Sequence, residues 1–232
     1  KGYMSGTIKI GIEGTTEEYF ASTIMSNNEI KKEPKTKVGE EIATENEGLI
    51  ETNDDHGLAY YFRGNVNNNY VTFAGLTWRI VQFAGFCWRI IRINGDGSIK
   101  LVLNNYTDIT ANFYEENSEL AIEDKLVFTK TNINTKLTEW YKARLSEYDT
   151  YLVSGKFCID NRESTTENDI KYYQAGPRLK TDYAATYNCE ATSTNERIGL
   201  LSADEVLLAG GSVNTDNTSY YLYTPEKEVA FW

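Results

Sequence analysis

The sequence predicts an α+β fold rich in β-strands, built from antiparallel sheets with one amphipathic helix and one short capped helix. The first reason is residues 57–103, which are dense in the aromatic and β-branched residues that suit a pleated, half-buried surface. The second is a repeat within them: residues 73–82 and 83–92 share Phe, Ala, Gly, Trp, Arg and Ile at matching positions. Both copies are predicted to be strands.

The repeat preserves the side-chain pattern of a strand, because an insertion of even length keeps the two-residue period. In each copy, the tryptophan, Trp78 or Trp88, should therefore point to one face of the sheet and the arginine that follows it to the other face. The alternative explanation is that one segment was written twice in the sequence.

A hairpin turn is predicted directly after the second copy. Residues 94–97 read Asn-Gly-Asp-Gly, and these residue types tolerate the positive φ that a tight turn requires. The strand that ends near Arg92 is therefore expected to return as residues 98–103.

Two other segments show helical signals. In the first, apolar residues recur at helical spacing after Asn134 or Thr135, either of which can serve as the N-cap; they are Leu137, Trp140, Tyr141, Leu145 and Tyr148. In the second, the short apolar strand 198–201 precedes a helix that begins with a capping box between Ser202 and Glu205 and ends at two consecutive glycines.

Residues 1–56 are predicted to be an N-terminal arm or linker with one strand. Residues 29–51 are charged, poor in aromatic residues and interrupted by Pro34 and Gly39, which is typical of a linker. Two interpretations remain open: a solvated tail, or an arm whose strand completes the sheet of a neighbouring subunit. The residues of this assembly strand are Thr7, Ile8, Lys9, Ile10, Gly11 and Ile12.

Residues 57–232 are predicted to form the β-rich domain. Residues 219–223 are predicted to be a strand, and residues 229–232 to begin one more that stops abruptly, so we expect the domain to be truncated there. An unfinished strand is a second assembly element, made of Val229, Ala230, Phe231 and Trp232.

Charge argues against two classes of partner. The chain has 34 acidic and 23 basic residues, a net charge of −11 and a pI of about 4.7. These values argue against a nucleic acid or an anionic membrane surface as the main partner. No apolar run approaches the roughly 18 residues that a membrane-spanning helix needs.

Three cysteines are present, and a disulfide between Cys158 and Cys189 is the preferred interpretation. Closing a loop of this length should stabilise the fold by about 3 to 4 kcal/mol through the entropy of the unfolded chain. Cys87 then remains as a buried, inert thiol among bulky apolar neighbours.

No motif in the chain predicts a catalytic residue, a metal site or a cofactor. His56 lies in an Asx-rich turn and is interpreted as a surface residue. Phosphate-binding loops, nucleophile elbows and clusters of metal ligands are missing. The acidic, asparagine-containing stretches 94–97 and 214–217 lack the regular ligand spacing of a calcium loop and are better explained as turns.

Five segments give the chain a resemblance to a group of bacterial surface proteins, some of them pilin-like: YYFRGNVNNNYVTFAG, WRIIRINGDGSIKLVL, the stretch around Cys158, IGLLSADEVLLAGG and SYYLYT. The resemblance covers residues 57–232. It implies antiparallel sheets of the C-type-lectin or formylglycine-generating-enzyme type. The group normally carries one FAG-x-x-WRI copy and continues beyond Trp232. The calcium ligands of sugar-binding lectins and the active cysteine pair of the enzymes are absent, so neither activity is expected.

The leading functional hypothesis is an extracellular, non-enzymatic bacterial surface or appendage protein. It would be a structural or adhesive filament subunit, forming a homo-oligomer or polymer by strand exchange. The alternative is a monomeric module that binds a glycan or a host surface protein through exposed aromatic residues such as Tyr172 and Tyr173. An enzyme of unknown activity is the third hypothesis.

Overall fold

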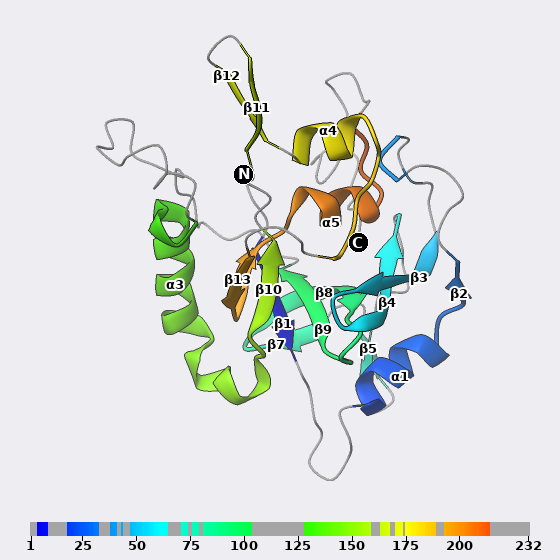
Figure 1. Ribbon diagram of the computed structural model, residues 1–232. Coiled ribbons are helices and arrows are strands. Elements are labelled where there is room, and N and C mark those ends of the chain that lie inside the picture. The colour runs from blue at the N-terminus through cyan, green and yellow to red at the C-terminus, as the bar shows by residue number, and fades with distance from the viewer. Residues whose placement is uncertain are drawn as a thin grey trace, which may run out of the picture.

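The computed structural model is a mixed α+β chain, as predicted (Figure 1). It describes residues 4–8, 18–32, 38–40, 43, 47–64, 71–73, 76–78, 81–103, 128–158, 163–167, 170–173, 175–188 and 193–213. The C-type-lectin-like arrangement stays a prediction.

The described strands are β1 (Met4–Ile8), β2 (Ile30–Lys31), β3 (Gly48–Asp54), β4 (Gly57–Arg63), β5 (Val71–Phe73), β6 (Leu76–Trp78), β7 (Val81–Phe83), β8 (Phe86–Ile93), β9 (Ile99–Leu103), β10 (Gly155–Cys158), β11 (Glu163–Glu167), β12 (Ile170–Tyr173), β13 (Ser193–Glu196) and β14 (Ile198–Leu200). The described α-helices are α1 (Glu18–Ser26), α3 (Asn132–Arg144), α4 (Ala175–Lys180) and α5 (Ala203–Leu208). Two 3₁₀ helices, Phe128–Lys130 and Ser146–Tyr151, flank α3.

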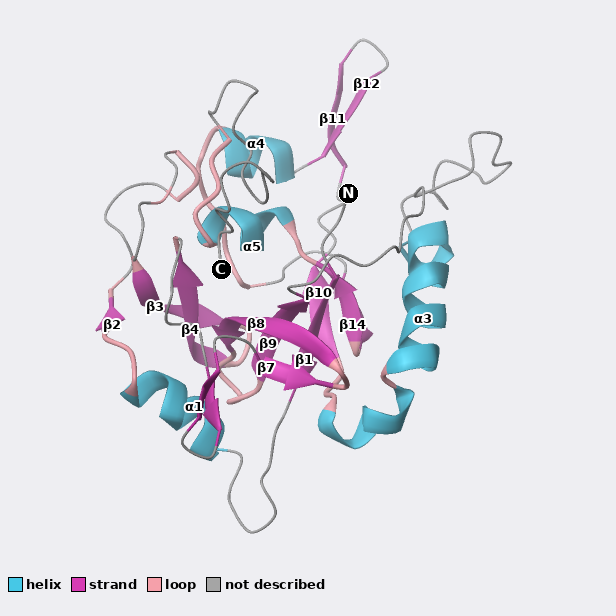
Figure 2. Cartoon of the chain, turned by 180° about the vertical axis from the view of Figure 1, so that it is seen from behind, coloured by secondary structure: helices cyan, strands magenta, loops and turns pink. Residues whose placement is uncertain are grey.

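One large sheet organises the described part of the chain. Its strand order is β14-β1-β9-β8-β4-β3-β2, with β7 also paired to β8. All neighbours are antiparallel except β2 and β3. Three two-stranded sheets, β10–β13, β11–β12 and β5–β6, accompany it. Helix α3 lies toward the β14 edge of the large sheet and α1 toward its β2 edge (Figures 1 and 2). Helices α4 and α5 lie near one end of its strands.

Both faces of the sheet are buried near its middle. Leu49 and Phe62 face the larger apolar cluster, to which α1 and α3 contribute Ile24 and Leu137. The neighbouring residues Ile50 of β3 and Tyr61 of β4 belong to a second buried cluster. Its other buried members are Tyr187 and Leu208, the last residue of α5. Because α5 covers this second face, its position depends on the sheet beneath it.

The repeated segment forms hairpin turns as well as strands. Ala84 and Gly85 both have positive φ, 52° and 76°, and join β7 to β8. Two such residues in sequence match the twist of an antiparallel hairpin. The prediction that residues 83–92 form one strand is therefore corrected: this copy is the end of one strand, a turn and a return strand. Strands β5 and β6 pair in the same way across the start of the first copy.

The predicted alternation and the predicted hairpin are both found in β8. Trp88 is buried and Arg89 is half-buried, as expected for successive residues on opposite faces. Residues 94–97 then form the turn to β9, with Asn94 N donating to Ser98 O and Gly97 in the left-handed region. The side chain of Trp78 lies outside the described residues.

Both predicted helices form, but one begins earlier than expected. The N-cap of α3 is Thr131, whose hydroxyl accepts a hydrogen bond from Asn134 N. Asn134 and Thr135 lie inside the helix, because the apolar side of α3 begins at Ile133, one turn before Leu137, and Ile133 packs against the core. The capping box of α5 between Ser202 and Glu205 is confirmed, and the helix ends before Gly210, which has a φ of +124°.

The N-terminal zone contributes more to the sheet than one strand. The predicted boundary between residues 56 and 57 falls in the turn of the β3–β4 hairpin, so it does not divide an arm from a domain. Strand β1 contains Thr7 and Ile8 but begins at Met4 and lies between β14 and β9. The other predicted assembly positions, 9–12 and 229–232, lie outside the described residues, as does the predicted strand 219–223.

In the described part of the chain, no helix is both long enough and apolar enough to cross a bilayer.

The two tight turns of the sheet pack against each other at Gly95, which has no room for a side chain. A Cβ there would lie 2.8 Å from Gly57 N and 2.9 Å from Asp54 Oδ1. Gly95→Ala should therefore lower the free energy of unfolding by about 1–3 kcal/mol, measured by urea denaturation. Gly97→Asn is the matched control, because Gly97 faces open space and Asn tolerates its φ of +80°. Equal losses in the two variants would contradict this packing.

Candidate functional site

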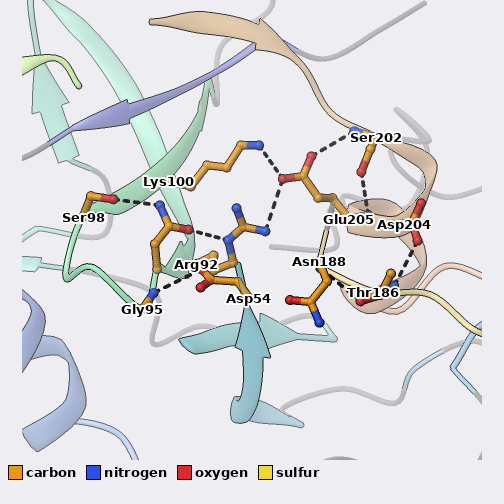
Figure 3. A network of polar contacts seen from close by, with 11 residues as sticks. Asp54, Arg92, Gly95, Ser98, Lys100, Thr186, Asn188, Ser202, Asp204 and Glu205 are labelled. Atoms are coloured by element: carbon orange, nitrogen blue, oxygen red, sulfur yellow. Dashed lines mark hydrogen bonds and ion pairs between the residues drawn. The ribbon is translucent and has the colours of Figure 1, made fainter. Parts of the chain in front are cut away.

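A buried group of charged side chains lies where the β8–β9 hairpin meets α5 (Figure 3). Lys100 Nζ lies 2.5 Å from Glu205 Oε1, and Arg92 Nη1 lies 3.7 Å from the same oxygen. The exposed fractions are 2% for Lys100, 9% for Arg92 and 5% for Glu205. Charges removed from water to this extent interact strongly but are costly to bury. We call these three residues the buried charge cluster.

A β-bulge places both cations on one face of the sheet. Ile90 pairs with Leu101, but the register shifts and Arg92 pairs with Lys100. The extra residue, Ile91, thus turns Arg92 away from the apolar side and toward Lys100. Like charges directly opposite one another in a sheet repel, so this arrangement needs a carboxylate nearby. Glu205 supplies it.

Glu205 is held in place by the N-terminus of α5. Its Oε2 accepts a hydrogen bond from Ser202 N at 2.9 Å, while Ser202 Oγ accepts one from Glu205 N at 3.2 Å. One carboxylate therefore completes the capping box with one oxygen and binds Lys100 with the other. The same side chain fixes the start of the helix and its contact with the sheet.

The next residue of α5, Asp204, forms a second anchor. Arg178 of α4 donates to both of its oxygens, Nη1 to Oδ1 and Nη2 to Oδ2, the latter at 2.9 Å. Thr186 N also donates to Asp204 Oδ1, at 2.9 Å. A two-pronged arginine–carboxylate contact fixes orientation as well as distance. It joins α4, α5 and the segment between them.

Arg63 of β4 binds the other end of α5. Its Nη1 donates to Leu207 O at 3.1 Å and to Leu208 O at 3.0 Å, and its Nε donates to Glu47 Oε2 at 2.6 Å. The last carbonyls of a helix lack partners within the helix and carry partial negative charge. Arg63, which is buried, satisfies two of them.

Aromatic rings cover the two cations of the buried charge cluster. The Arg92 guanidinium carbon lies 4.2 Å from the centre of the Tyr187 ring, and Lys100 Nζ lies 4.5 Å from that of Phe157. The negative face of an aromatic ring attracts a cation, and the attraction is larger when both are desolvated. These rings therefore partly compensate for the lost hydration of the two cations.

Polar side chains of the two tight turns complete the network. Asp54 accepts from His56 N at 2.8 Å and from Gly95 N at 3.1 Å, so it ties the β3–β4 turn to the β8–β9 turn. Asn94 Oδ1 accepts from Arg92 Nε at 2.6 Å, and Asn94 Nδ2 donates to Ser98 Oγ at 2.8 Å. The turns therefore orient Arg92 from the side opposite Glu205 (Figure 3).

Burial and charge act in opposite directions on the pKa values of the cluster. Burial lowers the pKa of Lys100 below its usual 10.5, although Glu205 partly offsets this. Burial raises the pKa of Glu205, but Lys100 and Arg92 outweigh this and hold it below its usual 4.5. Glu205 is therefore ionised at neutral pH. Burial also raises the pKa of Tyr187 well above 10.0, so the ring stays neutral beside Arg92.

A small pocket of about 50 Å³ opens between this cluster and the turns. Its walls come from both tight turns, from β10 and its preceding residues, from the segment around Thr186 and from the start of α5. Arg92, Lys100 and Glu205 all line it. The arrangement can bind and orient a small polar group.

The residues predicted from the sequence lie elsewhere or at the rim. Cys158, at the end of β10, is disulfide-bonded and lines the pocket. Its predicted partner, Cys189, lies outside the described residues, so the pairing stays a prediction; the side chain of Cys87 is also outside them. His56 is exposed in an Asx turn, as predicted. Tyr172 and Tyr173 both lie on β12.

Sequence reasoning found Glu205 only as a capping residue and missed Arg92 and Lys100. The available signal was the presence of charged residues inside two strongly apolar strands, two arginines in FCWRIIRI and one lysine in IKLVL. Strand alternation without the bulge would have placed Arg92 on the wrong face. The carboxylate that they share is 105 residues away from Lys100 in the sequence, so no local pattern indicates it.

No family model, no curated protein and no solved structure matches this chain. Within the described ranges, no group of three or more His, Cys, Asp or Glu residues is placed to hold a metal ion.

The buried charge cluster predicts a strong effect of removing Glu205. Glu205→Gln keeps an acceptor for Ser202 but leaves Lys100 and Arg92 without a carboxylate, so the free energy of unfolding should fall by about 3–5 kcal/mol. Adding Lys100→Met should restore part of that loss, because it removes one of the two cations. Chemical denaturation measures both variants.

The matched control is the exposed pair Lys136 and Glu139 on α3. Glu139→Gln should change the free energy of unfolding by less than about 0.5 kcal/mol, since exposed pairs contribute little. A loss for Glu205→Gln no larger than that of Glu139→Gln would show that the cluster does not hold α5.

Proposed function

We propose that this chain is a non-catalytic subunit of an extracellular bacterial surface or appendage structure, and that copies associate by exchanging their N-terminal strand. The observation that carries the proposal is the position of β1. It lies inside the sheet, between β14 and β9, and is antiparallel to both.

The pairing partners of β1 are distant in the chain. Ser5 pairs with Val102 on one side and with Gly199 on the other. A strand that joins the sheet only through distant partners can be supplied by a second copy in the same register, with every main-chain hydrogen bond retained. Removal of β1 would separate β14 from β9 and leave two unpaired strand edges.

The disulfide at Cys158 supports an oxidising compartment. Structural disulfides are common in secreted and surface proteins and rare in the reducing cytosol. The net charge of −11 argues against a nucleic acid as the main partner, because like charges repel.

Disulfide trapping tests strand exchange. In Ser5→Cys with Val102→Cys, the new cysteines are directly opposed across β1 and β9. Oxidation during assembly should give covalent dimers and longer ladders on a non-reducing gel, because exchanged strands connect different copies. The matched control is Thr52→Cys with Ala59→Cys, which are opposed within the tight β3–β4 hairpin and should give monomers.

Monomers only from the Ser5 and Val102 pair, with the crosslink confirmed by peptide mapping, would overturn strand exchange. As a second measurement, Gly6→Pro should abolish assembly, because Gly6 pairs with Leu101 and with Ile198 and proline cannot donate to a ladder. Assembly that survives Gly6→Pro would also contradict the proposal.

A second candidate function is a module that binds a glycan or a protein through tyrosines. The β11–β12 hairpin favours it, because this hairpin projects from the body of the molecule (Figure 2). Tyr172 and Tyr173 lie on β12, opposite Thr165 and Glu163. Aromatic residues on a projecting hairpin are available to a partner.

Glycan-array binding tests this candidate. Replacing Tyr172 and Tyr173 with Ala should lower the array signal at least about tenfold, since stacking and hydrogen bonds of tyrosines contribute most of the affinity at such sites. Tyr151→Ala is a control, because this tyrosine is exposed on a 3₁₀ helix away from the hairpin. A blank array for the unmodified protein would leave assembly as the supported function.

A further inference from the structure

The place that β1 occupies in the sheet is covered on one face. Phe157 of β10 lies directly against Gly199 of β14, since a Cβ built on Gly199 would lie 2.5 Å from Phe157 Cγ, closer than real Cβ atoms approach a neighbour. Gly199 is opposite Ser5 of β1 in the antiparallel register, and directly opposed residues share a face of the sheet. Position 5 of β1 therefore lies on the face that Phe157 covers.

Lys100 covers the same face from the other neighbour of β1. It lies on β9 opposite Thr7, and its Nζ lies 4.5 Å from the centre of the Phe157 ring. Strands β9 and β14 are two strand spacings apart, about 9–10 Å, because β1 lies between them. A lysine side chain that starts on β9 and ends beside a ring packed on β14 thus passes over β1.

The end of this lysine is bound to the chain that leaves β14. Lys100 Nζ lies 2.5 Å from Glu205 Oε1, and Glu205 follows shortly after Leu200, the last residue of β14. Lys100 and Phe157 are both buried, so the cover is closely packed. The two strands that flank β1 are therefore joined across it, and the slot between them is closed on this face.

We propose that the slot between β9 and β14 accepts the strand of a second copy only when the residue at position 5 of that strand is small. This inference rests on the proposed strand exchange and names the feature that selects the partner. The chain's own strand reads Met-Ser-Gly-Thr-Ile, with Ser5 and Thr7 on the covered face, so a second copy of this chain fits. A larger residue at position 5 would overlap the Phe157 ring, because a packed site admits extra atoms only at a cost.

A size exchange within one chain tests the slot. Ser5→Leu enlarges the strand beneath the ring and should lower the melting temperature of the full chain by about 2–10 °C. Phe157→Val removes most of the ring and keeps a residue type suited to a strand. Because the ring limits the space at position 5, the double variant should lose less than the sum of the two single losses.

Gly6→Leu is the matched control. Gly6 pairs with Leu101 and with Ile198, so position 6 has the same two neighbouring strands but lies on the opposite face. Phe157→Val should therefore not rescue Gly6→Leu, and the two losses should add. If Ser5→Leu alone does not fold, recovery of a cooperative transition in the double variant with Phe157→Val is the same expected result.

A crosslink between copies tests the selection of the partner. The donor carries Ser5→Leu with Gly6→Cys, and the acceptor carries Leu101→Cys with or without Phe157→Val; the two new cysteines are opposed across β1 and β9. After the copies are refolded together, the acceptor with Phe157→Val should give at least about ten times more crosslinked pairs, confirmed by peptide mapping. Overpacking of a buried site typically has a cost of this order.

The outcomes separate this inference from strand exchange itself. An unchanged melting temperature in Ser5→Leu, losses that add in the double variant with Phe157→Val, or equal crosslinking by both acceptors would overturn the selective slot, even if copies exchange strands. Rescue within one chain, with no crosslinked pair from any mixture, including one whose donor keeps Ser5, would support the slot and overturn strand exchange.

Discussion

The sharing of one buried carboxylate by two cations is the interaction on which the described structure depends. Helix α5 has only six residues, too few to be stable alone in water. Glu205 fixes its start and also binds Lys100 of the sheet, while Arg63 satisfies its last carbonyls. The helix therefore keeps its position through charged contacts at both ends, and its apolar residue Leu208 reaches the second face of the sheet as a result.

The β-bulge at Ile91 explains why such a cluster exists in this sheet. Without the shift in register, the alternation of β8 would direct Arg92 into the larger apolar cluster on the other face of the sheet. With it, the sheet has an apolar face covered by α1 and α3 and a polar corner covered by α5. The aromatic rings of Phe157 and Tyr187 lie against the two cations of that corner. One inserted residue thus keeps the charged side chain of Arg92 out of the apolar cluster and places it beside Lys100 and Glu205.

Local signals in the sequence predicted local structure well. The Asn-Gly-Asp-Gly turn and the Ser202 capping box both involve residues close together in the chain, and both form as expected. The cap of α3 was misplaced at Asn134 or Thr135, because the predicted apolar stripe began at Leu137 and left out Ile133, which also packs against the core. The buried charge cluster could not be predicted, since it needs a bulge that no residue type requires and a contact between Lys100 and Glu205.

Strand β1 also sets the order in which the chain can fold. Ser5 is made before its partners Val102 and Gly199, which emerge from the ribosome later. At synthesis rates of about 5–20 residues per second, β1 waits for about 10–40 seconds before the second of its neighbours exists. Closing such long loops is slow because the entropy is lost before the contacts form. Strand β1 can therefore enter the sheet only after both of its neighbours have been made, and once they exist, β9 and β14 can accept the same strand from another newly made copy.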